Sequence, residues 1–562
     1  MHTVNYETDM CVVGGGLAGL CCAIAAARHG IKTVLVHDRA VLGGNASSEI
    51  RMWVCGSHGK NNRETGIIEE IMLENFYQNK ALKFPLWDSV LYEKAIAEPN
   101  LTLLLNTSCF DATMEGQKIQ SITAWQSNAE TFHKIKAKYF ADCSGDSILA
   151  PLSGAEYRYG REAKSEFNET IPPDVADKKT MGMSCLFQIR ETTEKVEFIP
   201  PTWAYKYETD ADLPFKDHTR DDNFWWIELG GEWDCIHDTD RCRDELLKIC
   251  YGVWDHMKNR GDHGVDNWEL EWIGFLPGKR ESRRYVGEYI VTQNDVEAEG
   301  RFDDIVAYAG WSMDDHFPEG FYYKDGHPTI YHPAPQPWGL PLRVMISKNI
   351  QNLVFAGRNI SVTHTALSSS RVMATCAILG QALGTAVAQA VKDECNIRKI
   401  DVTKLQNSLM DDDCYIPWHN RTVSKLSKEA VCSCEVIRNG IDRADENCWK
   451  GNVGDRIIYT LEKPTKVSEL RIVFDSNLNR KYKNMPCNFP LEEKVIKLPE
   501  TLIKDYRIES VLEDESIKSI TVNNNHQRFV KHKVDWIVKE VHFIPLSTHG
   551  CETCNLFSFE IS

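Results

Sequence analysis

The sequence has no excess of positive charge. With 64 Lys and Arg against 81 Asp and Glu, the 562-residue chain carries a formal net charge of −17 and has an isoelectric point near 5.6. Because binding to phosphates requires a basic surface, this balance argues against a nucleic-acid partner. The length favours two or three domains.

Long hydrophobic runs are also scarce. Residues 10–27 form an uncharged stretch close to the length of a membrane-spanning helix. This stretch contains four glycines and follows Glu7 and Asp9, so it is a poor candidate for a membrane span. The first residues also lack the basic segment of a secretory signal. We therefore expect a cytoplasmic protein without a membrane partner.

Paired cysteine motifs are few, although the chain has 19 cysteines. Scattered cysteines in odd number, without a secretion signal, favour free thiols in a reducing compartment. Cys551 and Cys554 form a CxxC, and Cys432 lies close to Cys434, but no second ligand pair follows at metal spacing. We therefore expect no metal site.

The sequence does contain a glycine-rich unit near its start. Met10–Val13 is predicted to be a short apolar strand. It is followed by a GxGxxG turn and by a run of small residues that is typical of a helix. A second apolar strand covers residues 32–37. In this order the first glycine permits a sharp turn, the second lets a pyrophosphate approach the backbone, and the third lets helix and strand pack closely. The helix N-terminus offers free N–H groups to the phosphates. The unit predicts dinucleotide binding by Gly14, Gly16, Leu17, Ala18 and Gly19.

The end of the second strand departs from the usual pattern. An acidic residue normally stands there and binds the adenosine ribose. Here His37 occupies that position, and Asp38 and Arg39 follow it. Either His37 or Asp38 could meet the ribose, with a slight preference for Asp38, and Arg39 is a further candidate contact. No second GxGxxG unit exists, so we expect no internal NAD(P)H site, and the electron acceptor is unknown.

The loop at residues 41–59 reads VLGGNASSEIRMWVCGSHG. With the unit before it, this loop resembles the FAD-dependent oxidoreductases of the glutathione-reductase-type flavoprotein fold, in particular a bacterial group often found beside carbohydrate-degrading genes. In that family the GG-N-x-S-S-E segment wraps the flavin ribityl chain and pyrophosphate. The resemblance implies FAD contacts at Gly43, Gly44, Asn45 and Ser48. A glycine-rich surface loop is the alternative.

Two later segments extend the resemblance. Residues 139–146 read YFADCSGD, an apolar strand that ends in a turn, and the family uses this segment to return to the FAD domain. The resemblance implies cofactor contacts at Gly145 and Asp146, and a helix cap is the alternative role for Asp146. Residues 352–358 (NLVFAGR) form a strand followed by a loop, which implies contacts at Gly357 and Arg358.

A long helix is expected from about residue 371 to residue 390. In the family, the N-terminus of this helix faces the flavin pyrimidine ring, where its positive end stabilises the negative charge of reduced flavin. Ser369, Ser370 and Arg371 would lie nearest. Hydride transfer from a carbinol carbon also needs a base for the hydroxyl proton, and histidine titrates in the useful range. We nominate His364 as that base, with a structural loop histidine as the alternative.

The region between these segments, residues 151–345, holds nine of the 15 tryptophans. Aromatic faces can stack on sugar rings, although most of these tryptophans should be core. The region also contains PGKRESRR at residues 277–284, and the family has a closely similar R-E-S-R-R near the active site. Arg280 and Arg283 could orient a substrate through planar guanidinium groups. A solvated surface turn is the alternative. Asp314, Asp315, His316 and His332 are further acid–base candidates.

These features predict an α/β protein. A Rossmann-type FAD-binding domain would comprise residues 1–150 and 346–400, with an inserted α+β substrate region at 151–345. After a linker at 401–430, alternating runs predict an antiparallel β-sandwich at 431–562. This sandwich resembles the discoidin-like, galactose-binding modules, with Asn-Gly-Ile-Asp-Arg at 439–443. Such modules often bind glycans, while packing or dimerisation is an equally good use.

The function expected from this reading is FAD-dependent transfer of a hydride between a hydroxylated small molecule and flavin N5. A sugar or glycoside is the expected substrate, mainly because of the family association. One alternative is a flavin-dependent reductase of an unsaturated carboxylate, with the arginines clamping the acid. Another is a glycan-binding protein with a structural flavin. A homo-oligomer remains open.

Overall fold

The computed structural model describes residues 2–481, 484–492 and 495–562, which form two compact units. Unit 1 comprises Met1–Ser57, Ala81–Ile400 and Lys483–Lys494, and unit 2 comprises His58–Lys80, Asp401–Tyr482 and Val495–Ser562. The inserted substrate region therefore belongs to unit 1, whereas residues 58–80 belong to unit 2.

A parallel sheet forms the centre of unit 1. Strand β1 (His2–Val13) pairs in parallel with β2 (Thr33–Val36) on one side and with β6 (Thr131–Asp142) on the other. The sheet continues through β3 (Leu101–Leu104) beside β2 and β18 (Leu353–Phe355) beside β6, again in parallel. The predicted Rossmann-type α/β fold is confirmed. All these strands end at one edge, where the loops that follow them meet.

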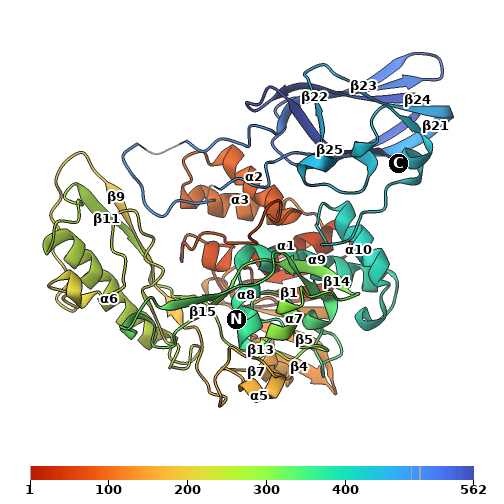
Figure 1. The fold of residues 1–562 in the computed structure, drawn as a ribbon. Coiled ribbons are helices and arrows are strands. Elements are labelled where there is room, and N and C mark those ends of the chain that lie inside the picture. Colours follow the sequence, from red (N-terminus) through yellow and green to blue (C-terminus); the bar gives the residue numbers. More distant parts are fainter. Residues whose placement is uncertain (1, 482–483, 493–494) are drawn as a thin grey trace. The chain divides into compact units, whose positions relative to one another are not determined.

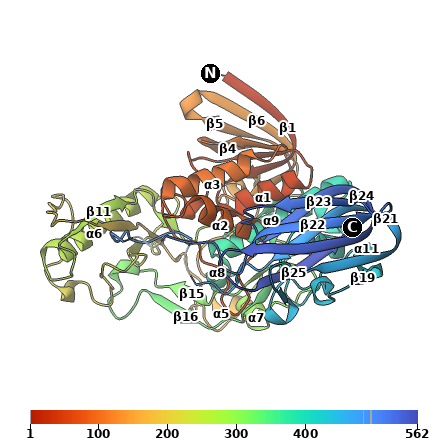
Figure 2. The same ribbon diagram turned by 90° about the horizontal axis from the view of Figure 1, so that it is seen from above.

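Strands β4 (Thr107–Glu115) and β5 (Lys118–Gln126) extend the sheet in antiparallel order, as Figure 2 shows beside β1 and β6. Strand β6 takes part in both portions of the sheet. Its first half pairs antiparallel with β5, while the whole strand pairs in parallel with β1. The twelve-residue β6 thus joins the excursion to the parallel core.

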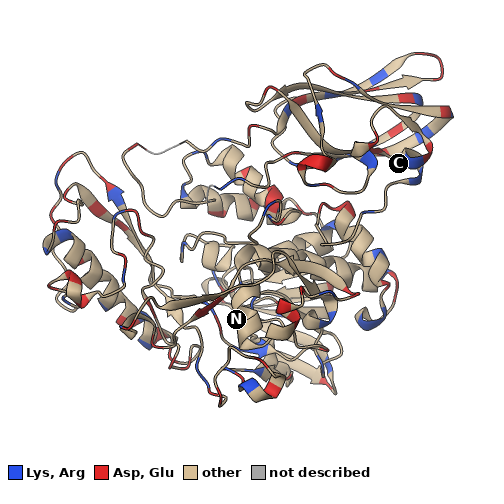
Figure 3. Cartoon of the chain, in the orientation of Figure 1, with Lys and Arg blue, Asp and Glu red and all other residues tan. Residues whose placement is uncertain are grey.

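Two helices rich in small residues pack together in unit 1. Helices α1 (Leu17–Arg28) and α9 (Met373–Lys392) are almost without charge, as Figure 3 shows by their tan colour. A Cβ at Gly380 would lie 2.0 Å from the carbonyl oxygen of Ala18, and one at Gly384 would lie 2.2 Å from that of Cys22. Glycine is therefore required for this close helix contact. Of the described helices, only α9 could span a membrane by length and composition, but 94% of its apolar window is buried in the protein.

The inserted region of unit 1 has its own core. The long helix α6 (Thr239–Asn259) packs near the antiparallel pair β9 (Phe187–Glu191) and β11 (Trp268–Ile273), and Figures 1 and 2 show the three elements together. Trp226, Trp254 and Trp268 are buried in this core. These tryptophans are structural, as expected for most of the set. The remaining strands of the region are short: β7 (Tyr157–Arg158), β8 (Met183–Ser184), β10 (Glu228–Leu229), β12 (Gly278–Lys279), β13 (Arg284–Tyr285), β14 (Ile305–Ala309), β15 (Met313–His316), β16 (Thr329–His332) and β17 (Trp338–Pro341).

Unit 2 is built on an antiparallel sheet (Figure 1), which confirms the predicted fold class. The order is β20-β25-β21-β24-β22-β23, and β19 also pairs with β21. Strand β21 (Ile457–Phe474) is one long strand that pairs with β24 with shifts in register. The other elements of unit 2 are α2 (Ile67–Gln78), α10 (Val402–Asp411), α11 (Lys425–Glu429), β19 (Val431–Cys432), β20 (Trp449–Gly451), β22 (Ile503–Leu512), β23 (Ile517–Val522), β24 (Phe529–Thr548) and β25 (Cys554–Ile561).

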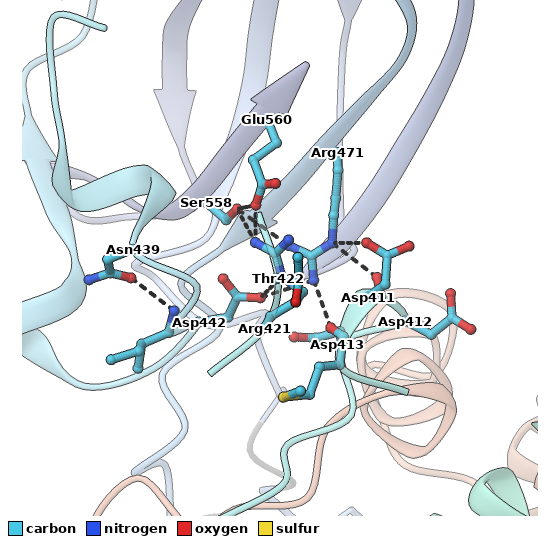
Figure 4. Close-up of polar contacts among 12 residues, drawn as sticks. Asp411, Asp412, Asp413, Arg421, Thr422, Asn439, Asp442, Arg471, Ser558 and Glu560 are labelled. Carbon is cyan, nitrogen blue, oxygen red and sulfur yellow. Dashed lines mark hydrogen bonds and ion pairs between the residues drawn. The ribbon is translucent and has the colours of Figure 1, made fainter. Parts of the chain in front are cut away.

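The Asn-Gly-Ile-Asp-Arg stretch of unit 2 lies within a buried charge network (Figure 4). Asp442 accepts a hydrogen bond from Arg471 at 2.9 Å and pairs with Arg421 at 3.4 Å. Arg421 also pairs with Glu560. Burial acts to raise the pKa of Asp442, but the nearby arginine charges lower it. The aspartate of the stretch thus fixes the chain that enters the sheet, and glycan binding by unit 2 remains a prediction.

We expect the substitution Gly384→Val to destabilise unit 1 by about 2–3 kcal/mol, because the new side chain would overlap the backbone of α1. The control is Lys392→Ala at the exposed end of the same helix, which should change stability by less than about 0.5 kcal/mol. Thermal unfolding followed by circular dichroism measures both. Equal melting temperatures for the two variants would contradict the close helix contact.

Candidate active site

A cavity of about 520 Å³ opens at the carboxyl ends of the parallel strands. Its walls come from the turns after β1, β2, β6 and β18, and from the inserted region. In open α/β sheets, ligands bind at this edge because the loops there leave a crevice. The two segments that the sequence matched to one nucleotide, near residues 16 and 358, both line this cavity.

The glycine turn after β1 has two kinds of glycine. Gly14 has a φ of +105°, and a Cβ on it would lie 2.5 Å from the backbone of Cys143, so the fold itself requires glycine there. Gly16 has ordinary extended angles, with φ −63° and ψ 175°. A Cβ on Gly16 would meet nothing nearer than the Cα of Gly44 at 3.9 Å. The fold itself would accept a side chain at position 16. A ligand that approaches this backbone closely would not, because a side chain would occupy its space.

The end of β2 shows what His37 and Asp38 do. His37 is buried, its Nδ1 accepts a hydrogen bond from the N–H of Gly15 at 2.9 Å, and its Nε2 donates to the carbonyl of Val41 at 2.9 Å. Burial lowers the pKa of His37, which favours the neutral ring that this pattern needs. The Asp38 side chain is 59% exposed at the cavity wall. His37 therefore shapes the glycine turn, and the geometry favours Asp38 as the residue for a ribose.

The turn after β6 is held by charge. Asp146 is bound by Lys279 at 2.8 Å, by Arg358 at 2.6 Å and by the hydroxyl of Ser282 at 2.7 Å. Burial acts to raise the pKa of Asp146, but Arg358 and Lys279 lower it well below the usual range. Helix α4 (Leu149–Ser153) has no side-chain cap, so the alternative role of Asp146 as a helix cap does not apply. Asp146 instead connects the returning segment to the inserted region.

The helix end that reaches the cavity begins two residues later than predicted. Ser369 and Ser370 lie at the end of a short helix, α8 (His364–Ser370), and their hydroxyls bond to the carbonyls of Trp311 and Ala366. Neither serine lines the cavity. Arg371 and the first residues of α9 do line it, so the positive end of a 20-residue helix does face this space.

His364 does not fit the role of base that the sequence suggested. It is buried outside the cavity wall, with Nδ1 2.9 Å from Glu281 and Nε2 3.0 Å from Asp315. Burial acts to lower the pKa of His364, but the two carboxylates raise it to about 10. A protonated ring with both nitrogens engaged cannot accept a substrate proton, so the structural alternative describes His364 better.

The R-E-S-R-R stretch is also internal, contrary to the alternative of a solvated turn. Arg284 is fully buried and pairs with Glu162 at 2.7 Å and with Glu281. Arg280 lines the cavity, whereas Arg283 does not and stacks its guanidinium over Tyr157. Of the arginines in this stretch, only Arg280 lines the cavity. Arg283 and Arg284 lie behind the cavity wall.

The inserted region supplies a polar end to the cavity. Nη2 of Arg280 donates to the hydroxyl of Ser184 at 2.7 Å and lies 2.8 Å from Glu228. Asp314 accepts hydrogen bonds from Trp311 at 3.3 Å and from Arg371 at 3.2 Å. Burial acts to raise the pKa of Asp314, but His316 and Arg371 lower it to about 2. This carboxylate is therefore ionised at neutral pH.

The cavity wall contains most of the predicted contacts. The predicted residues that line it are Gly14, Gly16, Leu17, Ala18, His37, Asp38, Arg39, Gly43, Gly44, Asn45, Gly145, Asp146, Arg280, Gly357, Arg358 and Arg371. Those that do not line it are Gly19, Ser48, Arg283, His364, Ser369 and Ser370. Gly19 packs against Gly14, which is the close contact expected of the third glycine.

Other lining residues carry no motif in the sequence. Ser184, Trp225 and Lys279 come from separate parts of the inserted region, while Trp53 lies within the loop at residues 41–59. Lys279 belongs to the basic stretch at residues 277–284, which is the one sequence signal that points to it. Nothing local distinguishes Trp225 from the buried Trp226 beside it, so only the fold selects between them.

The sequence model of the family described as FAD dependent oxidoreductase matches residues 9–409. This chain belongs to the FAD-dependent oxidoreductase family. FAD is its cofactor, and the cavity is where the matched segments would hold it. A search of curated proteins gives no significant match to this oxidoreductase.

Similar solved structures include a geranylgeranyl bacteriochlorophyll reductase-like protein from Thermoplasma acidophilum, at 11% identity, covering 73% of this chain and 85% of that chain, with a TM-score of 0.33. p-Nitrophenol 4-monooxygenase from Pseudomonas putida has 10% identity, coverage of 73% and 86%, and a TM-score of 0.32. The family 32 carbohydrate-binding module of EndoD from Streptococcus pneumoniae has 12% identity, coverage of 23% and 83%, and a TM-score of 0.19. Likenesses this weak carry no functional information.

The residues present fit FAD. Gly16 leaves open space beside its backbone, next to the N-terminus of α1, which suits a pyrophosphate. Arg358 and Arg371 on the cavity wall each keep a buried guanidinium nitrogen, Nε in both, without a hydrogen-bond partner among the described residues. Buried donors of this kind normally have partners, and the phosphate and ring oxygens of FAD are suitable acceptors.

We expect Gly16→Val to fold normally but to lose FAD, because the side chain would occupy the space that the pyrophosphate needs. Flavin absorbance per protein after purification should fall at least about tenfold, which corresponds to about 1.4 kcal/mol of lost binding. The melting temperature of the flavin-free variant should match that of flavin-free wild type. Full flavin content in the Gly16→Val protein would contradict the assigned site.

We expect the stability contributed by His364 to fall as the pH rises. Its pKa is raised from 6.5 to about 10, so this contribution is complete below about pH 6.5 and is lost as the pH passes through 10. Between pH 7 and pH 10 the loss is at most about 1.4 kcal/mol per pH unit. The melting temperatures of wild type and His364→Gln should therefore converge over this range, while the exposed-site control His237→Gln should track wild type. A constant gap for His364→Gln would rule out the charged ring.

Proposed function

We propose that this FAD-dependent oxidoreductase oxidises a CH–OH group of a small hydroxylated molecule, with sugars or glycosides as the substrate class. One observation carries the proposal. Nη1 of Arg280 and Oδ1 of Asp314 are buried, belong to residues on the cavity wall, and have no hydrogen-bond partner among the described residues. A hydroxyl group both accepts and donates a hydrogen bond, so it matches one donor and one acceptor that lack hydrogen bonds, the acceptor having only a 3.6 Å contact with Nε2 of His316.

Arg280 is the positioning group in this proposal. Its Nη2 is fixed by Ser184, by the carbonyl of Trp225 at 3.1 Å and by Glu228. These contacts hold the guanidinium plane, so that the remaining Nη1 can donate to the substrate oxygen. Because the side chain is already ordered, little conformational entropy is lost when the substrate binds.

Asp314 is the proton acceptor in place of His364. When bound, FAD supplies the acceptor for the two electrons that leave as hydride. As the C–H bond breaks, the hydroxyl becomes strongly acidic, so even a carboxylate with a pKa of about 2 can take its proton to Oδ1. Nε2 of His316 lies 3.6 Å from the same oxygen, and Nδ1 of His316 lies 2.9 Å from Glu228. His316, held by Glu228, thus stabilises the Asp314 carboxylate between turnovers.

The sugar class has separate but weaker support. Trp225 and Trp311 are the two of the nine inserted-region tryptophans that line the cavity, and indole faces stack on the apolar faces of sugar rings. The Nε1 of Trp311 is already engaged by Asp314, so the indole is held beside the proposed proton acceptor. Sugars are therefore the first compounds to test.

We expect Asp314→Asn to retain FAD and to lower kcat/KM for the substrate by about 10²–10⁴-fold, because the amide cannot accept the proton. The exposed Asp325→Asn serves as the matched control and should keep wild-type activity. A screen of sugars and glycosides for anaerobic loss of the oxidised-flavin absorbance provides the substrate for this assay. If Asp314→Asn reduces its flavin at the wild-type rate, the carboxylate is not the base.

A second candidate, a reductase of unsaturated carboxylates, is favoured by the two unpaired guanidinium nitrogens of Arg280 and Arg371 on the cavity wall. Two arginines can clamp a carboxylate. The ionised Asp314, which pairs with Arg371 at 3.2 Å, opposes a second anion, which is why we rank this candidate lower. Photoreduced protein that is reoxidised by unsaturated carboxylates, with no response of the oxidised protein to sugars, would favour the reductase.

A further inference from the structure

A cluster of three histidines and one aspartate lies in the inserted region, apart from the cavity wall. Asp210, His218, His256 and His263 each offer one ligand atom, and these atoms all lie within 4.8 Å of one another. Oδ1 of Asp210 is 3.0 Å from Nε2 of His256, 3.5 Å from that of His218 and 3.7 Å from that of His263. The three rings therefore surround one carboxylate oxygen.

The ring nitrogens are arranged as in metal sites. Nδ1 of His256 is 3.0 Å from the carbonyl of Tyr207, and Nδ1 of His218 is 2.6 Å from that of Lys216. A carbonyl only accepts, so each Nδ1 carries a hydrogen and the neutral ring has its lone pair on Nε2, towards the cluster. Metal-binding histidines are usually oriented by such second hydrogen bonds. Nε2 of His263 is buried and has no hydrogen-bond partner among the described residues.

Three protonated histidine rings held together by the Asp210 carboxylate alone would be a poor explanation of this cluster. The ring centroids are 4.8–5.0 Å apart, so three imidazolium ions would repel one another at close range. The single compensating charge is on Asp210, whose side chain is 75% exposed and therefore screened by water. One cation shared by three neutral rings and the carboxylate removes this repulsion and gives the orphaned Nε2 a partner.

We propose that Asp210, His218, His256 and His263 bind one Zn²⁺ ion per chain. Three imidazole nitrogens and one carboxylate oxygen are a suitable tetrahedral set for zinc. Hard cations such as Mg²⁺ and Ca²⁺ prefer oxygen ligands and fit this set poorly. The exposed Asp210 gives an ion access from solvent, while the His256 side chain is only 1% exposed.

The role of this site is structural. His256 lies near the C-terminal end of α6, whereas Thr239 at the N-terminal end of α6 lines the cavity. The 17 residues between them span about 25 Å along the helix, too far for the ion to touch a substrate in the cavity. The ion would tie the 3₁₀ turn at Asp210–Asp212 and the loop at His263 to α6.

The test uses the full-length, FAD-loaded protein without a histidine tag. After chelator treatment and dialysis, the protein is titrated with Zn²⁺, and bound metal is counted by mass spectrometry of the elements. We expect one tightly bound Zn²⁺ per chain and a higher melting temperature with zinc than without it. Co²⁺ should bind in the same place and give the intense visible bands of a tetrahedral site, beyond the flavin absorption.

If the proposal is right, the variants His218→Asn and His263→Asn bind Zn²⁺ more weakly than the wild type does. Each should weaken binding at least about tenfold, whereas the control His237→Asn, an exposed histidine at the other end of α6, should bind as wild type does. Flavin content and circular dichroism show whether each variant is folded, and His256 is left intact because it is buried. No stoichiometric zinc in the wild type, or equal affinity in the cluster and control variants, would overturn the proposal.

Discussion

The close approach of two backbone turns is the constraint on which the site depends. Gly14, at the end of β1, lies so near Cys143, at the end of β6, that no side chain fits between them. This contact brings the carboxyl ends of the two central strands together and opens the cavity above them. Because backbone N–H groups and a helix end then face one space, the site can hold the phosphates of FAD without a large cluster of lysines.

Buried charge forms the second layer of support. Glu281 connects Arg284 and His364, and Asp315 holds the other side of the histidine ring. Charges in such a place are costly unless each has its partner, so the network specifies one arrangement of the wall behind the cavity. On the cavity wall, by contrast, Arg280 and Asp314 each keep one buried atom without a hydrogen bond among the described residues. This contrast between satisfied and unsatisfied polar groups separates the framework from the reactive surface.

The structure shows why two predictions at the site, one for His364 and one for the serines at 369 and 370, differ from what is observed. His364 was selected because a histidine can serve as a base, but its neighbours Glu281 and Asp315 are 83 and 49 residues away in the chain. The serines at 369 and 370 were placed at a helix start because the break between α8 and α9 has no glycine or proline to mark it. The histidine cluster could not be predicted because its members are spread from residue 210 to residue 263 without regular spacing.

By itself, the sequence determined the polarity of the β1–α1–β2 unit, the family and the antiparallel character of unit 2, and it predicts a nucleotide at the turn after β1. These depend on short-range order: glycines at a turn, alternation along a strand and small residues along a helix. Only the tertiary structure decided that His37 is engaged in the glycine turn and leaves Asp38 available at the cavity wall, that His364 lies buried between two carboxylates, and that Arg280 and Asp314 each keep one atom without a hydrogen bond. The state of a polar side chain is set by the partners that folding brings to it, and those partners come from distant segments that no local pattern records.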